Sequence, residues 1–218
     1  MKYSAIITAG GTSSRYGNKN KLLEKINNQE VIKLSADHFL NHEQISEVII
    51  CAHSSIIEEL KAIFNNPPKL KIVEGGATRQ QSVYNGLCAT DADYVLIHDG
   101  ARPIISKSLI DSILETVQTQ KALTVATKTT DTIKYVENNK IIKTLDRSFL
   151  YNTQTPQAFE YRLIKDAHEK LKSQAFSDDA GMVEALNVPV YILENDYKNI
   201  KITTQNDLDI AKVYLNTL

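Results

Sequence analysis

Short apolar runs rich in Val and Ile alternate with longer amphipathic stretches along almost the whole chain. Several of the runs are apolar throughout, as β-strands covered on both faces should be. The strand candidates are Tyr3–Thr8, Glu47–Ala52, Leu70–Glu74, Tyr94–His98, Leu123–Thr127 and Val190–Leu193. The helix candidates are Ser55–Phe64, Thr78–Ala89, Ser106–Thr119, Tyr161–Ser173 and Gln205–Leu215. This alternation predicts an α/β fold with a mostly parallel twisted sheet flanked by helices.

The length and composition fit a single domain. The 218 residues are 42% hydrophobic and 23% charged, which is sufficient for a core. The net charge of −1 lacks the basic excess of a nucleic-acid-binding face. No apolar run approaches the length of a membrane span, and the N-terminus does not read as a signal peptide. We therefore expect one domain over residues 1–218, soluble and cytoplasmic, with neither nucleic acid nor membrane as a partner.

The two cysteines, Cys51 and Cys88, lie within apolar runs and show no spacing that could hold zinc. We expect both to be buried free thiols, in keeping with a reducing compartment.

One segment interrupts the strand–helix rhythm. Asp131–Asp146 reads "DTIKYVENNKIIKTLD", two strand-like runs around a turn at Asn138–Asn139. This pattern predicts an inserted β-hairpin. Two interpretations stay open: an edge hairpin on the main sheet, or an arm that leaves the body and packs on another subunit.

Cations and glycines recur where the predicted strands end. The segments after the first, third, fourth, fifth and last strands are "AGGTSSRYGNKNK", "GGATRQQS", "HDGARP", "KTTDT" and "NIK". Ligands of open parallel sheets bind at the carboxyl ends of the strands, and glycines let backbone N–H groups approach an anion. The pattern therefore indicates a phosphate or nucleotide site at this edge.

The glycines of the first segment, Gly10, Gly11 and Gly17, do not have the spacing of GxGxxG. The pattern GxxxxGK[ST] fails because Gly17 is followed by Asn18 and Lys19. The segment instead carries Arg15, Lys19 and Lys21 within seven residues, which suits a triphosphate better than a monophosphate. For Lys19 we favour an ordinary surface lysine.

The glycine pair at Gly75–Gly76 can pass flat against a planar ligand, and Ser82 can hydrogen-bond a base edge. Thr78 is the expected N-cap of the helix that follows. Arg79 either binds a ligand or holds this loop.

In "HDGARP", Asp99 lies at a strand end, well placed for Mg²⁺ beside a triphosphate. Arg102 either binds a substrate phosphate or orients the loop. For His98 we favour a half-buried packing role.

Together these segments resemble the 2-C-methyl-D-erythritol 4-phosphate cytidylyltransferase family of the non-mevalonate isoprenoid pathway. The resemblance runs nearly end to end, and its specific parts are "GGATRQQSVYNGL", "VLIHDGARP", "DRSFLYNTQTPQAF" and "SDDAGMVE". It implies a Rossmann-like fold of the nucleotide-diphospho-sugar-transferase type. It also implies transfer of CMP from CTP to the polyol phosphate, release of pyrophosphate, and a requirement for Mg²⁺ or another divalent cation.

The resemblance further implies roles for single residues. The catalytic cations would be Arg15, Lys21 and Lys201. The nucleotide would be bound by Ala9, Gly10, Gly11, Gly76, Ser82 and Gly100. The polyol-phosphate site would involve Asp99, Arg102, Thr132, Arg147 and Thr155, with Asp99 also binding the metal. Thr132 and Arg147 would serve the neighbouring subunit's site, which favours a homodimer formed through a hairpin arm at 131–147.

Three positions depart from the family pattern: Asn20 replaces a usual proline, Ala77 a common polar or acidic residue, and Ser177 a usual threonine. None of these changes removes a charge that the chemistry needs.

Other functions are weighed against this one. Ribitol-5-phosphate cytidylyltransferase is the nearest alternative, but that family tends to carry "HDAVRP"-like and "TDAC"-like segments. An NAD-type oxidoreductase would need the motif GxGxxG, which the glycine spacing of this chain does not provide, and an acidic residue about twenty positions later. A non-catalytic nucleotide-binding protein gives no reason for cations after so many strands.

Overall fold

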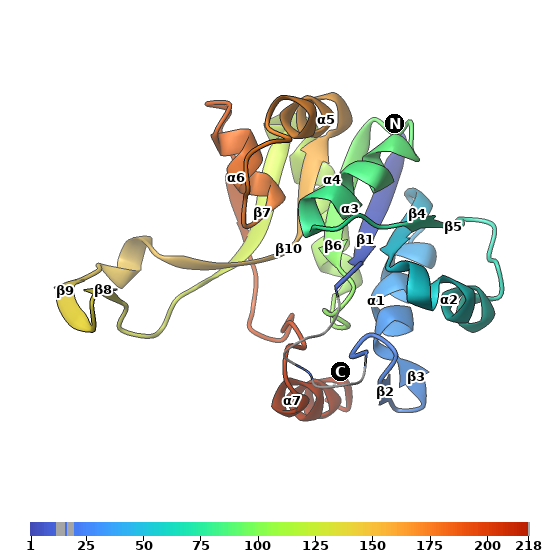
Figure 1. Cartoon of the computed structure of the whole chain (residues 1–218), viewed down its shortest axis with the longest axis horizontal. Coiled ribbons are helices and arrows are strands. Elements are labelled where there is room, and N and C mark those ends of the chain that lie inside the picture. Colours follow the sequence, from blue (N-terminus) through green and yellow to red (C-terminus); the bar gives the residue numbers. More distant parts are fainter. Residues whose placement is uncertain (12–15, 17–19, 218) are drawn as a thin grey trace.

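A seven-stranded sheet forms the centre of the molecule, with strand order β11-β7-β10-β6-β1-β4-β5 (Figure 1). The structure is a computed structural model, and it describes residues 1–11, 16 and 20–217. The strands are β1 Tyr3–Ala9, β4 Ile45–Ala52, β5 Leu70–Glu74, β6 Tyr94–Asp99, β7 Ala122–Lys128, β10 Tyr151–Glu160 and β11 Tyr191–Glu194. Only β10 is antiparallel to its neighbours in this described sheet. The predicted α/β fold with a mostly parallel sheet is confirmed.

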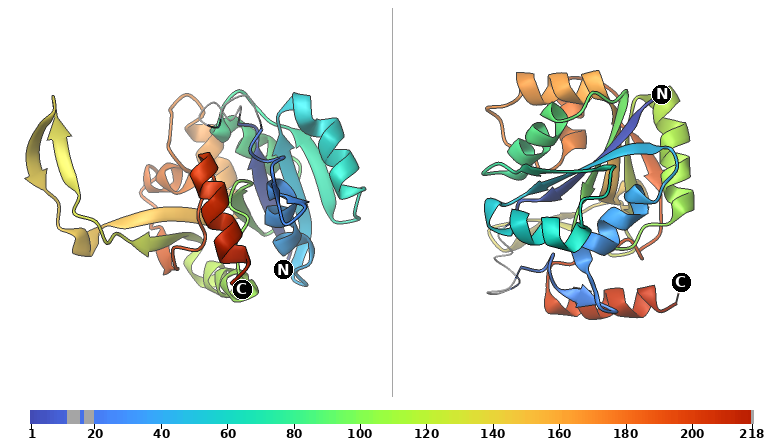
Figure 2. Two further views of the ribbon diagram at one scale, coloured as in Figure 1. Left: turned by 90° about the horizontal axis from the view of Figure 1, so that it is seen from below. Right: turned by 90° about the vertical axis from the view of Figure 1, so that its right-hand side faces the viewer.

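Helices cover both faces of the sheet (Figures 1 and 2). Their bounds are α1 Val31–Leu40, α2 Ile57–Phe64, α3 Arg79–Cys88, α4 Lys107–Gln120, α5 Tyr161–Lys170, α6 Asp179–Glu184 and α7 Gln205–Leu215. Ala5 and Ile7 of β1 pack into one core with α1, α2 and α4, whereas Ile6 packs into another with α3, α5 and α6. Successive side chains of a strand point to opposite faces, so an apolar β1 supports two layers of helices. In the part of the chain that the structure describes, no helix is long and apolar enough to cross a membrane.

Helix α7 lies beneath the end of the sheet at which β1 ends (Figure 1). It packs with the short strand β2, Lys25–Ile26, around a third small core, and β2 pairs with β3, Gln29–Glu30. Thr204 and Asp207 form a capping box at its N-terminus. This packing brings the C-terminal helix to the carboxyl edge of the sheet.

Strand β10 is a polar strand in the sheet interior. Its register shifts between Thr153 and Gln157, around Pro156, which has no N–H to donate to a ladder. The buried Gln157 side chain donates to Thr124 Oγ1 at 3.0 Å and accepts from the Asp179 N–H at 3.0 Å. Side-chain hydrogen bonds thus satisfy polar groups that an interior strand would otherwise leave unpaired.

The hairpin arm, residues 131–147, projects from the body (Figures 1 and 2). Its strands β8, Lys134–Glu137, and β9, Lys140–Thr144, form a separate two-stranded sheet and are exposed throughout. Asn138 and Asn139 have φ values of 49° and 61°, the left-handed conformations that a type I′ turn requires. The predicted hairpin and its turn are confirmed, and the edge-hairpin interpretation is wrong.

Both cysteines are free thiols, but only Cys51 is buried. The prediction that Cys88 is also buried is wrong. Cys88 is the last residue of α3, and its Sγ faces outward, 2.7 Å from Lys165 Nζ, while Leu87 beside it faces the core.

Candidate active site

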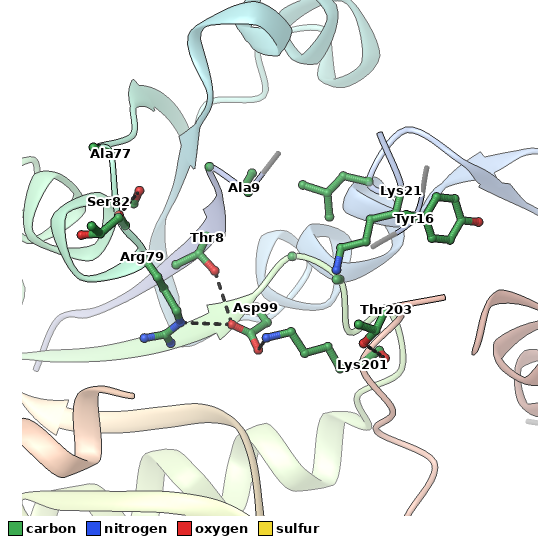
Figure 3. Close-up of a pocket in the computed structure, with 16 residues that line it drawn as sticks. Thr8, Ala9, Tyr16, Lys21, Ala77, Arg79, Ser82, Asp99, Lys201 and Thr203 are labelled. Atoms are coloured by element: carbon green, nitrogen blue, oxygen red, sulfur yellow. Dashed lines mark hydrogen bonds and ion pairs between the residues drawn. The ribbon is translucent and has the colours of Figure 1, made fainter. Parts of the chain in front are cut away.

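A pocket of about 370 Å³ opens at the carboxyl ends of β1 and β6 (Figure 3). Strand β1 lies between β4 and β6, so the chain departs from β1 toward one side of the sheet and later returns on the other. Such a point of reversal is where open α/β sheets bind ligands. Of the residues that the sequence analysis assigned to a site, the pocket is lined by Ala9, Gly10, Gly11, Lys21, Ser82, Asp99, Gly100 and Lys201.

The other assigned residues lie elsewhere. Gly76 immediately precedes the pocket-lining Ala77. Arg102 and Thr155 are buried, whereas Thr132 and Arg147 are exposed at the base of the hairpin arm. Arg15 and Lys19 lie outside the described residues.

Asp99 is the electrostatic centre of the pocket. It is the last residue of β6 and is 6% exposed. Lys201 Nζ lies 2.8 Å from Oδ2, Arg79 Nε lies 3.4 Å from Oδ1, and Arg102 Nε lies 3.6 Å from Oδ2. Burial acts to raise the pKa of Asp99, but these cations hold it far below the usual carboxyl range. Arg79 is also paired with Asp179, so the cluster holds two carboxylates and three cations. The remaining positive charge, together with Lys21 at the pocket, favours a polyanionic ligand.

Behind the pocket, hydrogen bonds fix the end of β6. Thr155 Oγ1 accepts from the Asp99 N–H at 3.0 Å and lies 2.9 Å from His98 Nδ1. His98 Nε2 lies 3.0 Å from the Arg102 carbonyl oxygen, which can only accept. Nε2 therefore carries the proton and Nδ1 accepts from Thr155. Burial lowers the pKa of His98 to about 3, and the ring is fully buried rather than half-buried as predicted.

The segment that carries Lys201 is fastened to the same region. Arg102 Nη1 donates to the Asn199 carbonyl at 2.7 Å, and Asn199 Nδ2 donates to the Thr155 carbonyl at 2.7 Å. The Ile202 N–H donates to the Ala101 carbonyl at 2.8 Å. Arg102 thereby links the loop after β6 to the segment that carries Lys201, and its role toward a substrate phosphate stays a prediction. The sequence analysis did not single out Asn199, because one Asn in "NIK" carries no signal of such contacts.

A network of hydroxyl contacts shapes the loop before α3. Ser82 Oγ accepts from the Gly76 N–H at 3.0 Å and donates to the Thr78 carbonyl at 2.9 Å. Thr78 is the predicted N-cap, since its Oγ1 accepts from the Gln81 N–H at 3.1 Å. A Cβ on Gly10 would lie 2.9 Å from Ser82 Oγ. The end of β1 and the start of α3 therefore approach each other as closely as glycine allows.

Lys21 enters the pocket from the side of Tyr16, opposite Arg79 (Figure 3). Asn20 holds the turn that carries it, because its Oδ1 accepts from the Leu22 N–H at 3.0 Å. An Asx-type turn of this kind restrains the backbone at the position where the family that the sequence resembles usually has proline.

The start of α7 borders this turn. Tyr16 donates its hydroxyl to Gln205 Oε1 at 2.9 Å. Burial acts to raise the pKa of Asp207, but hydrogen bonds at the α7 N-terminus and the positive charge of Lys21 lower it. The C-terminal helix is thus part of the wall around Lys21.

A divalent cation fits this pocket only together with an anionic ligand. The described residues include no group of three or more His, Cys, Asp or Glu that could hold a metal ion. Asp99 is the one acidic side chain that lines the pocket among them. Mg²⁺ is commonly held by one or two carboxylates, substrate phosphates and water, and Asp99 suits that arrangement as a single protein ligand.

The sheet and its cationic pocket define an α/β protein built to bind a nucleotide or similar polyanion at the carboxyl edge. A family model described as "IspD: 2-C-methyl-D-erythritol 4-phosphate cytidylyltransferase" matches residues 3–217. The chain belongs to this family, and the resemblance inferred from its motifs is confirmed.

Individual relatives agree along their whole length. A protein of Caldanaerobacter subterraneus subsp. tengcongensis named 2-C-methyl-D-erythritol 4-phosphate cytidylyltransferase is 40% identical, over 99% of each chain. A protein of the same name from Bacillus pumilus is 38% identical over 99% of this chain and 98% of its own. The crystal structure of 4-diphosphocytidyl-2C-methyl-D-erythritol synthase from Anaerococcus prevotii superimposes with a TM-score of 0.88 at 32% identity, covering 99% of this chain and 96% of that one. The similarity therefore includes the hairpin arm and α7 as well as the nucleotide-binding core.

Proposed function

We propose that this chain is a cytidylyltransferase that transfers CMP from CTP to 2-C-methyl-D-erythritol 4-phosphate. The products are pyrophosphate and 4-diphosphocytidyl-2-C-methyl-D-erythritol, an intermediate of isoprenoid precursor synthesis. Membership of the family over nearly the whole chain supports the reaction. The observation that carries it at the site is Asp99 surrounded by Lys201, Arg79 and Arg102 at the pocket that Lys21 enters.

The chemistry explains why cations dominate the pocket. A phosphate oxygen of the polyol phosphate forms a new bond to the α-phosphorus of CTP, and the bond to the bridging oxygen of the β-phosphate breaks, so pyrophosphate leaves. A phosphate monoester is already largely ionised near pH 7, since its second pKa is about 6. No side chain has to remove a proton. The task of the protein is to bring two anions together and to stabilise the charge on the transferred group.

In this proposal each part of the pocket has one task. Lys21 and Lys201 neutralise the phosphates from two sides, and Arg15 joins them. Nucleotide contacts come from Ala9, Gly10, Gly11, Gly76, Ser82 and Gly100. Glycine at the approach of β1 to α3 suits backbone contact with the base and ribose, because a side chain there would fill the space.

We further propose that Mg²⁺ accompanies the nucleotide. When bound, it neutralises charge on the phosphate oxygens. Asp99 would hold it, while Lys201 stays beside that carboxylate and neutralises a phosphate.

Our proposal includes a homodimer that forms through the hairpin arm. Thr132 and Arg147, which family resemblance assigns to the polyol phosphate, do not line the pocket of their own chain. Arg147 Nη1 donates to the Thr130 carbonyl at 2.6 Å, so its side chain lies at the base of the arm. Ile141 on the arm and Phe149 just after it are 64% and 81% exposed, which fits burial against a second subunit. A cytoplasmic location also belongs to the proposal, because two free cysteines fit a reducing compartment.

The test is pyrophosphate release from CTP and Mg²⁺ with each polyol phosphate in turn. We expect turnover with 2-C-methyl-D-erythritol 4-phosphate and none above background with ribitol 5-phosphate. ATP in place of CTP is the matched control for the base. Turnover with ribitol 5-phosphate alone would assign the chain to the alternative cytidylyltransferase, and turnover with neither acceptor would reject the proposed function.

A further inference from the structure

We propose that Asp179 is a positioning residue of the active site, which holds Arg79 so that Arg79 meets Asp99 through a single nitrogen. Asp179 does not line the pocket and belongs to α6, on the face of the sheet that α3 covers. The inference rests on the proposed function, because its effect is measured in CMP transfer.

Arg79 joins two buried carboxylates. It is the first residue of α3 and lines the pocket. Its Nη1 lies 2.6 Å from Asp179 Oδ2, whereas its Nε lies 3.4 Å from Asp99 Oδ1. The shorter contact is the one away from the pocket. The guanidinium is therefore held principally by Asp179, on the side away from the pocket, and it contacts Asp99 only through Nε (Figure 3).

Contacts restrain Asp179 at both carboxylate oxygens and at its backbone N–H. Its side chain is 1% exposed, and Oδ1 lies 3.0 Å from His168 Nε2. Its N–H donates to Gln157 Oε1, which ties the start of α6 to β10. Burial acts to raise the pKa of Asp179, but the charge of Arg79 and the contact with His168 lower it. With both oxygens engaged, the carboxylate cannot rotate to follow Arg79.

The geometry matters because of what an unrestrained arginine does. A guanidinium prefers to meet a carboxylate with two parallel N–H groups. Without Asp179, the guanidinium of Arg79 would turn so that two of its N–H groups meet the Asp99 carboxylate. Asp99 already holds Lys201 at 2.8 Å, so a two-pronged contact would compete with Lys201 for the same carboxylate. Asp179 thus acts through Arg79 and Asp99 on the placement of a catalytic lysine.

The experiment compares Asp179→Asn with Asp178→Asn in the full-length protein. Both substitutions remove one negative charge from neighbouring residues of nearly the same shape. The Asp178 carboxylate accepts from the Gly181 N–H at 3.0 Å and from Nε2 of Gln157 at 2.9 Å. It shares Gln157 with the Asp179 N–H, but among the described contacts it reaches neither Arg79 nor Asp99. Measurements are kcat for CMP transfer, Kd for CTP by calorimetry and the thermal midpoint of each variant.

We expect Asp179→Asn to lower kcat by about 10–100-fold while Kd for CTP changes by less than about threefold, because misplacement affects the transition state more than binding. Asp178→Asn should keep a kcat near that of the wild-type enzyme. Equal kcat values for Asp179→Asn and wild type would overturn the inference, as would an equal loss in Asp178→Asn. An inactive wild-type protein would instead reject the proposed function.

A second variant covers the case in which Asp179→Asn does not fold. Arg79→Lys keeps the charge but offers one nitrogen, which cannot meet both carboxylates. A folded Arg79→Lys protein with wild-type kcat would contradict the inference. Where Asp179→Asn does fold, adding it to Arg79→Lys should cause no further loss of kcat, and a fully multiplicative loss would show that Asp179 acts by another route.

Discussion

A single carboxylate, that of Asp99, organises the polar end of the sheet. An ionised group with so little exposure is costly unless cations compensate it. Lys201, Arg79 and Arg102 provide that compensation from three different segments of the chain. The same contacts place positive charge around the pocket. Stability of the fold and preparation for an anionic ligand therefore depend on one cluster of side chains.

At this scale, His98 gives a pH-dependent prediction. Burial lowers its pKa in the folded chain to about 3, below the value near 6.5 of an unfolded histidine. Between these values the unfolded state binds more protons, so this contribution to stability is complete above about pH 6.5 and declines as the pH falls toward 3. We expect ¹⁵N NMR at pH 5 to show His98 neutral with the proton on Nε2. A positively charged His98 ring at pH 5 would contradict the assignment, and His98→Gln identifies its resonances.

At the scale of elements, short apolar strands and amphipathic helices could be predicted from sequence. β5 and α7 were predicted with the bounds that the structure shows, Leu70–Glu74 and Gln205–Leu215. Helix α1 was missed, and Glu30 at its N-terminus makes no side-chain cap. Strand β10 was missed because its stretch "TQTPQAF" is polar and contains proline, and its hydrogen-bond partners lie far along the chain.

The residues of the candidate site also divide into those that could be predicted from sequence and those that could not. Residues at or just after the ends of β1 and β6, such as Asp99 and Gly10, could be placed at the carboxyl edge from the strand pattern alone. Asn199 and Asp179 could not, because their roles consist of contacts across the fold. Arg79 contacts Asp179 from a position 100 residues away. Local sequence carries no signal of such a contact.

Helix α3 packs unusually close to the sheet, and this gives a prediction at the element scale. A Cβ on Gly86 would lie 2.6 Å from Ile6 Cγ2 and 2.7 Å from Cys51 Sγ. Because both contacts are under 3 Å, the overpacking cost should fall in the upper part of its range of about 1–3 kcal/mol, and the gain in helix propensity offsets about 1 kcal/mol. We therefore expect Gly86→Ala to lower the free energy of unfolding by about 1–2 kcal/mol.

Urea denaturation measures this difference. Gly11→Ala is the matched control, since no heavy atom of the described residues lies within 4 Å of a Cβ there, and its unfolding midpoint should stay near that of the wild type. If Gly86→Ala were as stable as the wild type, α3 could shift outward at no cost, contrary to the packing described here.

At the scale of the whole molecule, the proposed dimer makes the active site a joint product of two chains. Lys21 lines the pocket of its own chain, whereas Arg147 lies at the base of the arm. We expect Lys21→Ala to lower kcat by about 10²–10³-fold, as the loss of one preorganised donor does elsewhere. Arg147→Ala should impair the site of the partner subunit.

Mixing the two variants tests this division. In a two-fold dimer that exchanges subunits, half of the dimers pair one variant with the other. Each of these mixed dimers has one intact site out of two. Activity should therefore recover to about a quarter of the wild-type value. Lys21→Ala incubated alone is the control. No recovery, with subunit exchange verified by affinity tags, would argue against sites shared between chains.

Strands β7 and β10 are antiparallel neighbours, joined by residues 129–150. Along the chain, β7 and β10 form one long β-hairpin, and the arm lies in the segment that connects them. The hairpin closes where the Thr129 N–H donates to the Leu150 carbonyl at 3.0 Å, and Lys128 pairs with Tyr151. Because the cost of closing a loop rises only slowly with its length, this segment can lengthen, shorten or change sequence during evolution without altering the register of the sheet. Descendants of this chain can thus vary the tip of the arm, whereas Thr132 and Arg147 at its base are constrained by their proposed place in the partner's site.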